Sequence, residues 1–142
     1  MLYTLAAYPQ NHLVVVTLAP PAGTRSETVH NFRMIAEYTA HFVRRHAGPT
    51  FRIFDFSMLD LPFTNLAIFL VEGAKRRPGS LTDGCVQNFA VGCTETMIAD
   101  VYEVQQQGAG LDLTVLPTMD DALAHIESVL RPQKLISTLS WN

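Results

Sequence analysis

The chain has 142 residues and a formal net charge of -3, and 48% of its residues are hydrophobic. This size and hydrophobic content are typical of one globular domain that buries a core without metals or disulfides, and they exclude an intrinsically disordered chain. The mildly acidic balance gives no general attraction to nucleic acid or to an anionic membrane, so we expect neither as a partner.

Targeting signals and cofactor motifs are missing from the sequence. No stretch reaches the roughly 20 apolar residues of a membrane span, and the first residues lack the basic region of a signal peptide. Cys85 and Cys93 form neither a CxxC pair nor part of a zinc-ligand pattern. We therefore expect a cytoplasmic protein with two reduced thiols and with no metal or other cofactor.

The first third of the chain predicts a hairpin followed by a long helix. Apolar runs at residues 2–8 and 12–19 flank the turn-forming stretch "PQNH", which is the pattern of two adjacent strands. Thr24 and Glu27 have the T-x-x-E spacing of a capping box, and apolar residues recur at helical spacing from Val29 to Val43. We expect this helix to cover one face of a sheet.

Strands and helices alternate along the rest of the chain. The predicted strands are residues 50–56, 85–92 and 111–116. The predicted helices run from about Thr64 to Glu72, from Met97 to Val104 and from Ala122 to Leu130. The last helix is expected to begin at a second capping box, Thr118 and Asp121, and to end at Pro132. The complete order, β-β-α-β-α-β-α-β-α, is typical of an α/β fold with right-handed crossovers. We predict a single domain over residues 1–142, with a five-stranded, mostly parallel mixed sheet, an antiparallel edge strand and four helices.

The end of the chain, residues 131–142, is predicted to be a tail. It carries more apolar residues than a purely solvated tail would: Leu135, Ile136, Leu139 and Trp141. The tail is therefore expected either to be flexible, or to add a short strand, or to pack on the body or on a second subunit.

Two stretches of the sequence carry a resemblance to a known family. They are "FRIFDFSMLDLPFTNLAIFL" and "FAVGCTETMIADVYEVQQQGAGLDLTVLPTMDDALAHI". With the element order, they resemble the STAS domain (sulfate transporter and anti-sigma-factor antagonist), and look closer to a stand-alone subgroup that is related in fold to a family of lipid-binding proteins. The resemblance covers roughly Leu2 to Leu130.

The resemblance implies a candidate phosphorylation site. In anti-sigma-factor antagonists, a kinase partner phosphorylates a serine at the start of the helix that follows the third strand. Asp55 and Ser57 match the end of that strand, and Thr64, nine residues after Asp55 (64 − 55 = 9), falls at the position of the serine. The sequence departs from the family pattern at Phe63 and Leu66. Thr64 and Ser57 are the possible phosphosites.

The residues alone give Thr64 another role, as the N-cap of the second helix. A threonine at an N-cap stabilises its helix by about 1 kcal/mol, because its hydroxyl oxygen accepts a free backbone N–H. Asn65 is a rival for the same position. The interpretation as a cap is the one that the pattern favours.

Cys93 and the basic loop are the other candidate sites. Cys93 falls at a strand-to-helix junction, where it is either an activated thiol or a half-buried structural residue. Lys75, Arg76 and Arg77 precede a Pro-Gly turn, where they either bind a phosphate or an acidic partner, or form a solvated face.

Two functional hypotheses follow. The first is a non-enzymatic STAS-like domain that binds a protein partner, or itself as a homodimer, through the surface of the second helix and the basic loop. The second is binding of a small apolar molecule or lipid at the carboxyl ends of the strands, near Gly92 and Cys93, beside an apolar wall of Met58, Phe63 and Phe69. An enzyme that uses Cys93 is a third and weaker hypothesis.

The apolar loop from Met58 to Phe63 should decide between the first two hypotheses. If it folds inward over a cavity, ligand binding gains support, and if it stands exposed, a protein interface gains support.

Overall fold

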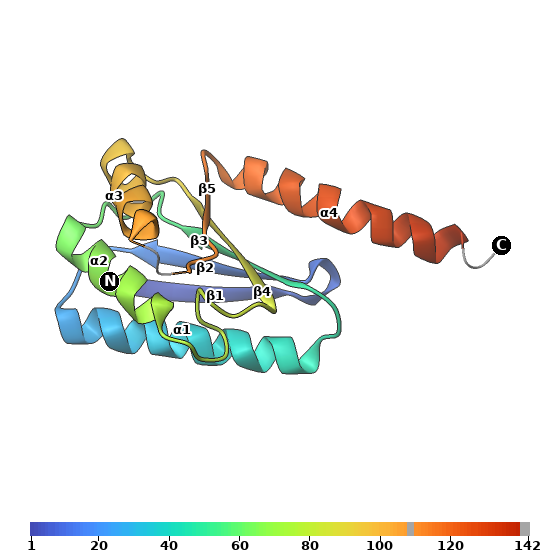
Figure 1. Ribbon diagram of the computed structural model, residues 1–142, viewed down its shortest axis with the longest axis horizontal. Coiled ribbons are helices and arrows are strands. Elements are labelled where there is room, and N and C mark those ends of the chain that lie inside the picture. The colour runs from blue at the N-terminus through green and yellow to red at the C-terminus, as the bar shows by residue number, and fades with distance from the viewer. Residues whose placement is uncertain (108–109, 140–142) are drawn as a thin grey trace.

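The computed structural model describes the backbone of residues 1–107 and 110–139, and the side chains of residues 1–107 and 110–131 (Figure 1). Its strands are β1 (Leu2–Tyr8), β2 (Leu13–Ala19), β3 (Thr50–Asp55), β4 (Val86–Val91) and β5 (Thr114–Leu116). Its helices are α1 (Arg25–Arg45), α2 (Phe63–Ala74), α3 (Glu95–Gln106) and α4 (Met119–Leu139), and a 3-10 turn, η1 (Pro9–Asn11), joins β1 to β2. The predicted element order is confirmed.

The five strands form one sheet in the order β1-β2-β3-β4-β5. β1 pairs with β2 in antiparallel orientation, and every other neighbouring pair is parallel. The predicted mixed sheet with an antiparallel edge strand is therefore confirmed. The strand predicted at residues 111–116 is shorter in the structure. Only the last three residues of that run, Thr114–Leu116, pair with β4 and form β5.

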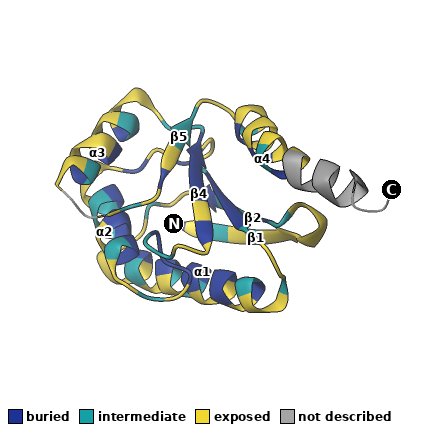
Figure 2. Ribbon diagram, turned by 45° about the vertical axis from the view of Figure 1, so that its right-hand side comes forward, coloured by how far each residue is buried: buried dark blue, intermediate teal, exposed yellow. Residues whose placement is uncertain are grey.

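The two faces of the sheet carry separate hydrophobic cores. The larger core joins α1, α2 and α3 to side chains such as Val16, Phe54 and Ala90. The smaller one joins α4 to Phe51, Ile53 and other side chains of the opposite face. α4 lies apart from the other three helices, on the far side of the strands (Figure 2).

Both predicted capping residues, Thr24 and Thr118, cap their helices, and the pair Thr118 and Asp121 forms the complete reciprocal box. The Thr24 hydroxyl accepts the backbone N–H of Glu27 at 3.2 Å at the start of α1. At the start of α4, Thr118 accepts the N–H of Asp121 at 3.2 Å, and the Asp121 carboxylate accepts the N–H of Thr118 at 3.2 Å. Each cap satisfies backbone donors that a helix end leaves free.

The prediction that Pro132 ends the last helix is wrong, because α4 continues to Leu139. A proline inside a helix removes one backbone hydrogen bond, here the one to the carbonyl of Ser128. Ser128 is exposed, so water can reach that carbonyl. The tail is thus helical as far as Leu139, while the side chains of Leu135, Ile136 and Leu139, and all of Trp141, lie outside the described residues. Within the described residues, no helix has the length and apolar character to cross a membrane.

Candidate functional site

The apolar loop that follows β3 is split between the core and the surface. Leu59 and Leu61 are buried, at 5% and 3% exposure. Met58 and Phe63 point outward, at 64% and 51% exposure. The two leucines fill the space beneath the loop, so the part of the loop that remains available for contact is an exposed apolar surface.

Phe69, expected as part of a ligand wall, does not reach the surface. It is 1% exposed and packs edge-to-face against Phe32, Phe54 and Phe56, with ring centroids 4.7, 5.3 and 6.1 Å away. Its position on α2 puts it on the helix face that meets the sheet, where aromatic rings pack in this geometry. Phe69 is therefore a core residue that holds α2 in place.

The prediction that Thr64 caps the second helix is also wrong. α2 begins at Phe63, its N-cap is Pro62, and no side chain caps it. Proline suits this position because it has no backbone N–H to leave unsatisfied. Thr64 therefore lies inside the first turn with an exposed hydroxyl, and the Asn65 amide donates instead to the carbonyl of Gly23 at 3.3 Å.

The carboxyl ends of β3 and β4 are closed by backbone packing. A Cβ on Gly92 would lie 2.7 Å from the backbone nitrogen of Ser57, so the chain after β3 rests directly on this glycine. The Asp55 carboxylate accepts the N–H of Ser57 at 2.9 Å. Ser57 itself is exposed at the rim. The chain after β3 therefore passes directly over Gly92 at the carboxyl ends of these two strands.

Cys93 is half-buried beside this rim. Burial, together with the negative charge of Asp55, raises the pKa of its thiol to about 11. A nucleophilic cysteine needs the opposite shift, toward a stable thiolate. Of the two interpretations that the sequence left open for Cys93, the half-buried structural residue is the one that fits, because burial and a neighbouring carboxylate both raise the pKa of the thiol.

A groove of about 360 Å³ lies between α1 and α2. We call it the α1–α2 groove, and its lining residues are Arg25, Val29, Phe63, Thr64, Ala67, Ile68, Val71, Glu72 and Lys75. Two of its apolar side chains stand well into solvent, Phe63 at 51% and Val71 at 59% exposure. Large exposed apolar side chains gathered around one hollow are a mark of an interaction surface.

A cluster of charges lies at one end of the groove, around Glu72. The Glu72 side chain is only 3% exposed, and its carboxylate lies 3.0 Å from Arg33 Nε, 2.7 Å from Lys75 Nζ and 3.2 Å from Arg77 Nη2. Burial by itself would raise the pKa of Glu72, but the hydrogen bonds from Lys75 and Arg33 and the nearby positive charges outweigh it, so the pKa is lowered. Three cations around one carboxylate leave a local excess of two positive charges.

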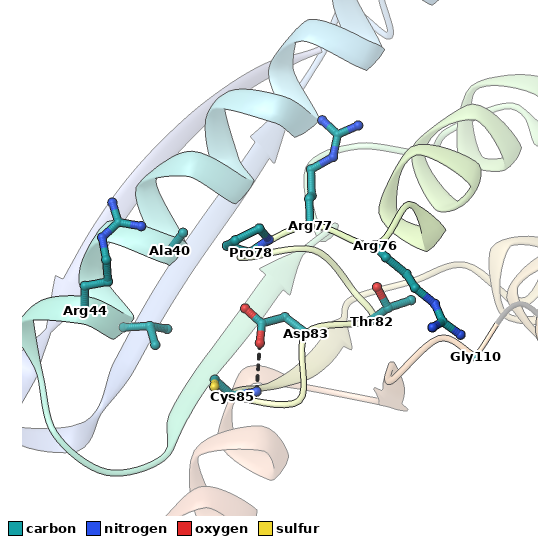
Figure 3. Close-up of a pocket in the computed structure, with 10 residues that line it drawn as sticks. Ala40, Arg44, Arg76, Arg77, Pro78, Thr82, Asp83, Cys85 and Gly110 are labelled. Atoms are coloured by element: carbon teal, nitrogen blue, oxygen red, sulfur yellow. Dashed lines mark hydrogen bonds between the residues drawn. The ribbon is translucent and has the colours of Figure 1, made fainter.

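A second hollow, of about 610 Å³, lies on the other side of the basic loop. Cys85, which lines it, directly precedes β4, so this hollow is at the amino ends of the parallel strands. Arg44, Arg76 and Arg77 also line it, but their guanidinium groups point in different directions (Figure 3). Both carboxylate oxygens of Asp83 accept backbone N–H groups of its own loop, at 2.7 and 2.9 Å. This arrangement offers no point on which the arginines converge around one phosphate.

Arg52 holds the basic loop to the sheet. Its side chain is fully buried, where Nε donates to Asn88 Oδ1 at 2.8 Å and Nη1 donates to Thr39 Oγ1 at 2.9 Å and to the carbonyl of Gly79 at 2.6 Å. The guanidinium lies 4.8 Å from the centroid of the Phe54 ring. Burial lowers the pKa of Arg52 to about 9, so the group remains charged at neutral pH.

Gly79 lets the loop approach α1 closely. A Cβ at this position would overlap the carbonyl oxygen of Ala36, and the backbone φ of +79° is one that glycine adopts without strain. The loop therefore passes over α1 with no side chain between the two backbones.

The sequence interpretation missed Arg52 and Glu72, although each leaves a signal. Arg52 is the one charged residue inside "TFRIF", and Glu72 is the one charged residue inside the helical run "FTNLAIFLVEGA". A single charge in an otherwise apolar element is seldom left unpaired, because burial of an isolated charge is unfavourable. The basic residues that the sequence singled out, Lys75 and Arg77, turn out to be partners of Glu72.

Comparisons with models of protein families, with curated proteins and with solved structures find no match to this chain. The resemblance to the STAS domain therefore remains a prediction.

Proposed function

We propose that this chain is a non-enzymatic, STAS-like regulatory domain that acts by binding a protein partner through the α1–α2 groove. The observation that carries the proposal is the pairing of exposed apolar side chains with unbalanced positive charge. Phe63 and Val71 supply apolar surface, and Arg25 lines the same groove as Lys75, which is one of the three cations around Glu72. Exposed aromatic residues with an arginine nearby are enriched at protein interfaces.

The groove favours one kind of partner segment. An amphipathic helix can place its apolar face into a groove between two helices, as many peptide ligands do. Carboxylates on the flanks of that segment would meet Arg25 on one side and the charge excess around Glu72 on the other. We therefore infer an acidic, amphipathic segment of another protein as the ligand.

Thr64 gives the groove a candidate switch. Its exposed hydroxyl lines the groove, and a phosphate there would add about two negative charges where the partner brings its own. Phosphorylation at Thr64 would therefore weaken binding. Intact-mass measurement of protein from its native host tests for the phosphate on Thr64, and it would also detect a phosphate on Ser57. Unmodified protein under every growth condition would contradict the switch.

The test of the proposal compares matched variants in partner capture. Wild type, the double variant Phe63→Ala and Val71→Ser, and the control Tyr102→Ala are immobilised and exposed to native extract. Tyr102 lies on α3, is 54% exposed and does not line the groove. The control substitution therefore removes a similar aromatic surface from a different place. Proteins retained by wild type and by the control are purified, and their affinities for wild type, the control and the double variant are measured.

Loss of the Phe63 ring should lower the affinity for a purified partner about 30-fold. This corresponds to about 2 kcal/mol, the contribution of an interface hot spot. The affinity should also fall as salt is added, because the charges of the groove contribute. Equal binding by wild type and the double variant, with a partner verified in purified form, would place the interface elsewhere and overturn the proposal.

A further inference from the structure

β1 is an edge strand of the sheet, and within the described residues its outer side has no partner strand. It pairs with β2 over seven consecutive residue pairs, from Leu2 with Ala19 to Tyr8 with Leu13, without a bulge. None of its seven residues is buried, whereas β2 has four buried residues. One side of the β1 backbone therefore carries N–H and C=O groups that no strand within the described residues pairs with.

The start of this strand is held in a defined place. The Met1 amine donates to the carbonyl of Ala22 at 2.7 Å, and the Asn31 amide donates to the carbonyl of Met1 at 2.6 Å. The Met1 side chain is 3% exposed and belongs to the larger core. β1 is therefore a fixed edge rather than a frayed end.

β1 has none of the features that usually keep sheet edges from pairing. Such edges carry charged residues, prolines or bulges, or they are very short. The strand "LYTLAAY" contains no charge and no proline. The opposite edge, β5, has three residues and is followed directly by Pro117. The sheet is thus protected at one edge and open at the other.

The sequence of β1 is complementary to itself in antiparallel orientation. In a register centred on Leu5, Leu2 of one copy faces Tyr8 of the other, Tyr3 faces Ala7, and Thr4 faces Ala6. Aromatic side chains opposite aliphatic ones are favourable cross-strand pairs. In a two-fold symmetric pair, a charged residue near the axis would face the same charge on the other copy and be repelled. β1 contains no charged residue, so this repulsion is absent.

The face of the sheet beside β1 is also open. Leu2, Thr4, Ala6 and Tyr8 lie on the α4 side of the sheet and are all exposed, Leu2 at 62% and Tyr8 at 49%. Helix α4 packs on β3, β4 and β5, and the core that it covers includes Leu13 and Val15 of β2 but, among the described residues, none of β1. Pairing of two copies would bring these side chains together in a continuous surface.

We propose that two copies of this chain associate through their β1 strands, which pair antiparallel about Leu5 to form one ten-stranded sheet, five strands from each copy. The contact is isologous and closes on itself, so it produces a dimer rather than a fibre. It uses a different surface from the α1–α2 groove, and it does not depend on the proposed function.

A charge exchange across the two-fold axis tests the proposal. Variant one carries Thr4→Lys and Ala6→Lys, and variant two carries Thr4→Glu and Ala6→Glu. In the proposed register, residue 4 of one copy faces residue 6 of the other, so each variant opposes like charges and the mixture opposes unlike charges. The molar mass in solution is measured by light scattering after size exclusion.

Wild type should have twice the chain mass of 15.8 kDa. Each charged variant alone should have the mass of one chain, and an equimolar mixture should return to twice that mass. The control Thr114→Lys puts the same charge on β5, where Thr114 is exposed, and should leave the dimer intact. Circular dichroism verifies that each variant is folded.

The proposal is overturned if wild type is monomeric over a wide range of concentration, or if the lysine variant remains dimeric. It is also overturned if two folded variants fail to associate on mixing, since the register then does not place positions 4 and 6 opposite each other.

Discussion

The two faces of the sheet differ in how they are covered and in what they bury. On one face, α1, α2 and α3 enclose a large core that also contains the charged side chains Arg52 and Glu72. On the other face, α4 alone covers a smaller and purely apolar core, and the strip beside β1 is left exposed.

This difference explains where the candidate sites fall. Helices that pack side by side leave grooves between them, and the α1–α2 groove is one of these. A single helix covers only part of a sheet, so the α4 face offers its strand edge instead. One face is therefore suited to a helical segment of another protein, and the other is suited to a strand.

The first prediction removes the buried charge of the three-helix face. Arg52→Ala should lower the free energy of unfolding by about 4 kcal/mol, because it leaves a hole and takes away the donor of several buried hydrogen bonds. The control Arg131→Ala removes an exposed arginine of α4 that pairs with Glu127 at 3.4 Å, and should change stability by less than about 0.5 kcal/mol. Urea denaturation measures the free energy of unfolding of both variants. Similar losses of stability in the two variants would mean that Arg52 does not hold the loop.

The second prediction compares aliphatic truncations in the two cores. Leu70→Ala, at a fully buried position on α2, should lower the free energy of unfolding by about 4 kcal/mol, and Ile126→Ala on α4 by about 2 kcal/mol. The difference arises because a lone helix can move toward the sheet and shrink the cavity, whereas α2 is held by two neighbouring helices. A larger loss for Ile126→Ala, measured by the same denaturation, would reverse the ranking of the two faces.

The third prediction concerns the two cysteines, which lie before and after β4. With a pKa of about 11, two units above the ordinary 9.0, Cys93 should react with iodoacetamide at pH 8 about 100-fold more slowly than an ordinary thiol. Mass spectrometry of the digested protein follows each site, and the exposed Cys85 serves as the internal reference. Faster labelling of Cys93 than of Cys85 would restore the activated-thiol interpretation.

The fourth prediction is the smallest and depends on pH. Glu72→Gln should lower the free energy of unfolding by about 1 kcal/mol at neutral pH, since its cations can turn to water. The pKa of Glu72 is lowered in the folded state, so its stabilisation is present above the ordinary value of 4.5 and is lost as the pH falls through the folded pKa. Wild type and variant should therefore converge in acid, and a difference that stays constant with pH would contradict the lowered pKa.

The fold could be predicted because its signals are local. The capping boxes at Thr24 and Thr118 and the alternation of apolar runs are visible within short windows of sequence. The errors occurred where two local rules competed. Pro132 is a helix breaker by itself, yet the backbone of α4 continues past it to Leu139. Thr64 is a good N-cap residue, but Pro62, two residues earlier, occupies the N-cap position of α2.

The candidate site was harder to predict because it depends on packing between distant segments. The loop "MLDLPF" has no period that tells Leu59, which is buried, from Met58, which is exposed. The groove brings Val29 of α1 and Ile68 of α2 to the same hollow, and no motif in the sequence indicates that they line it together. The basic loop was recognised from its composition, but its pairing with Glu72 was not.

The Arg52 contacts also have a consequence for how this sequence can vary. Positions 39, 52, 79 and 88 share one set of hydrogen bonds, and position 79 must be glycine while the loop rests on α1. A related chain with an apolar residue at position 52 would have no use for the polar groups at 39 and 88. We expect the residues at these four positions to covary among related chains. Their combination would then be a sequence motif by which such relatives could be recognised.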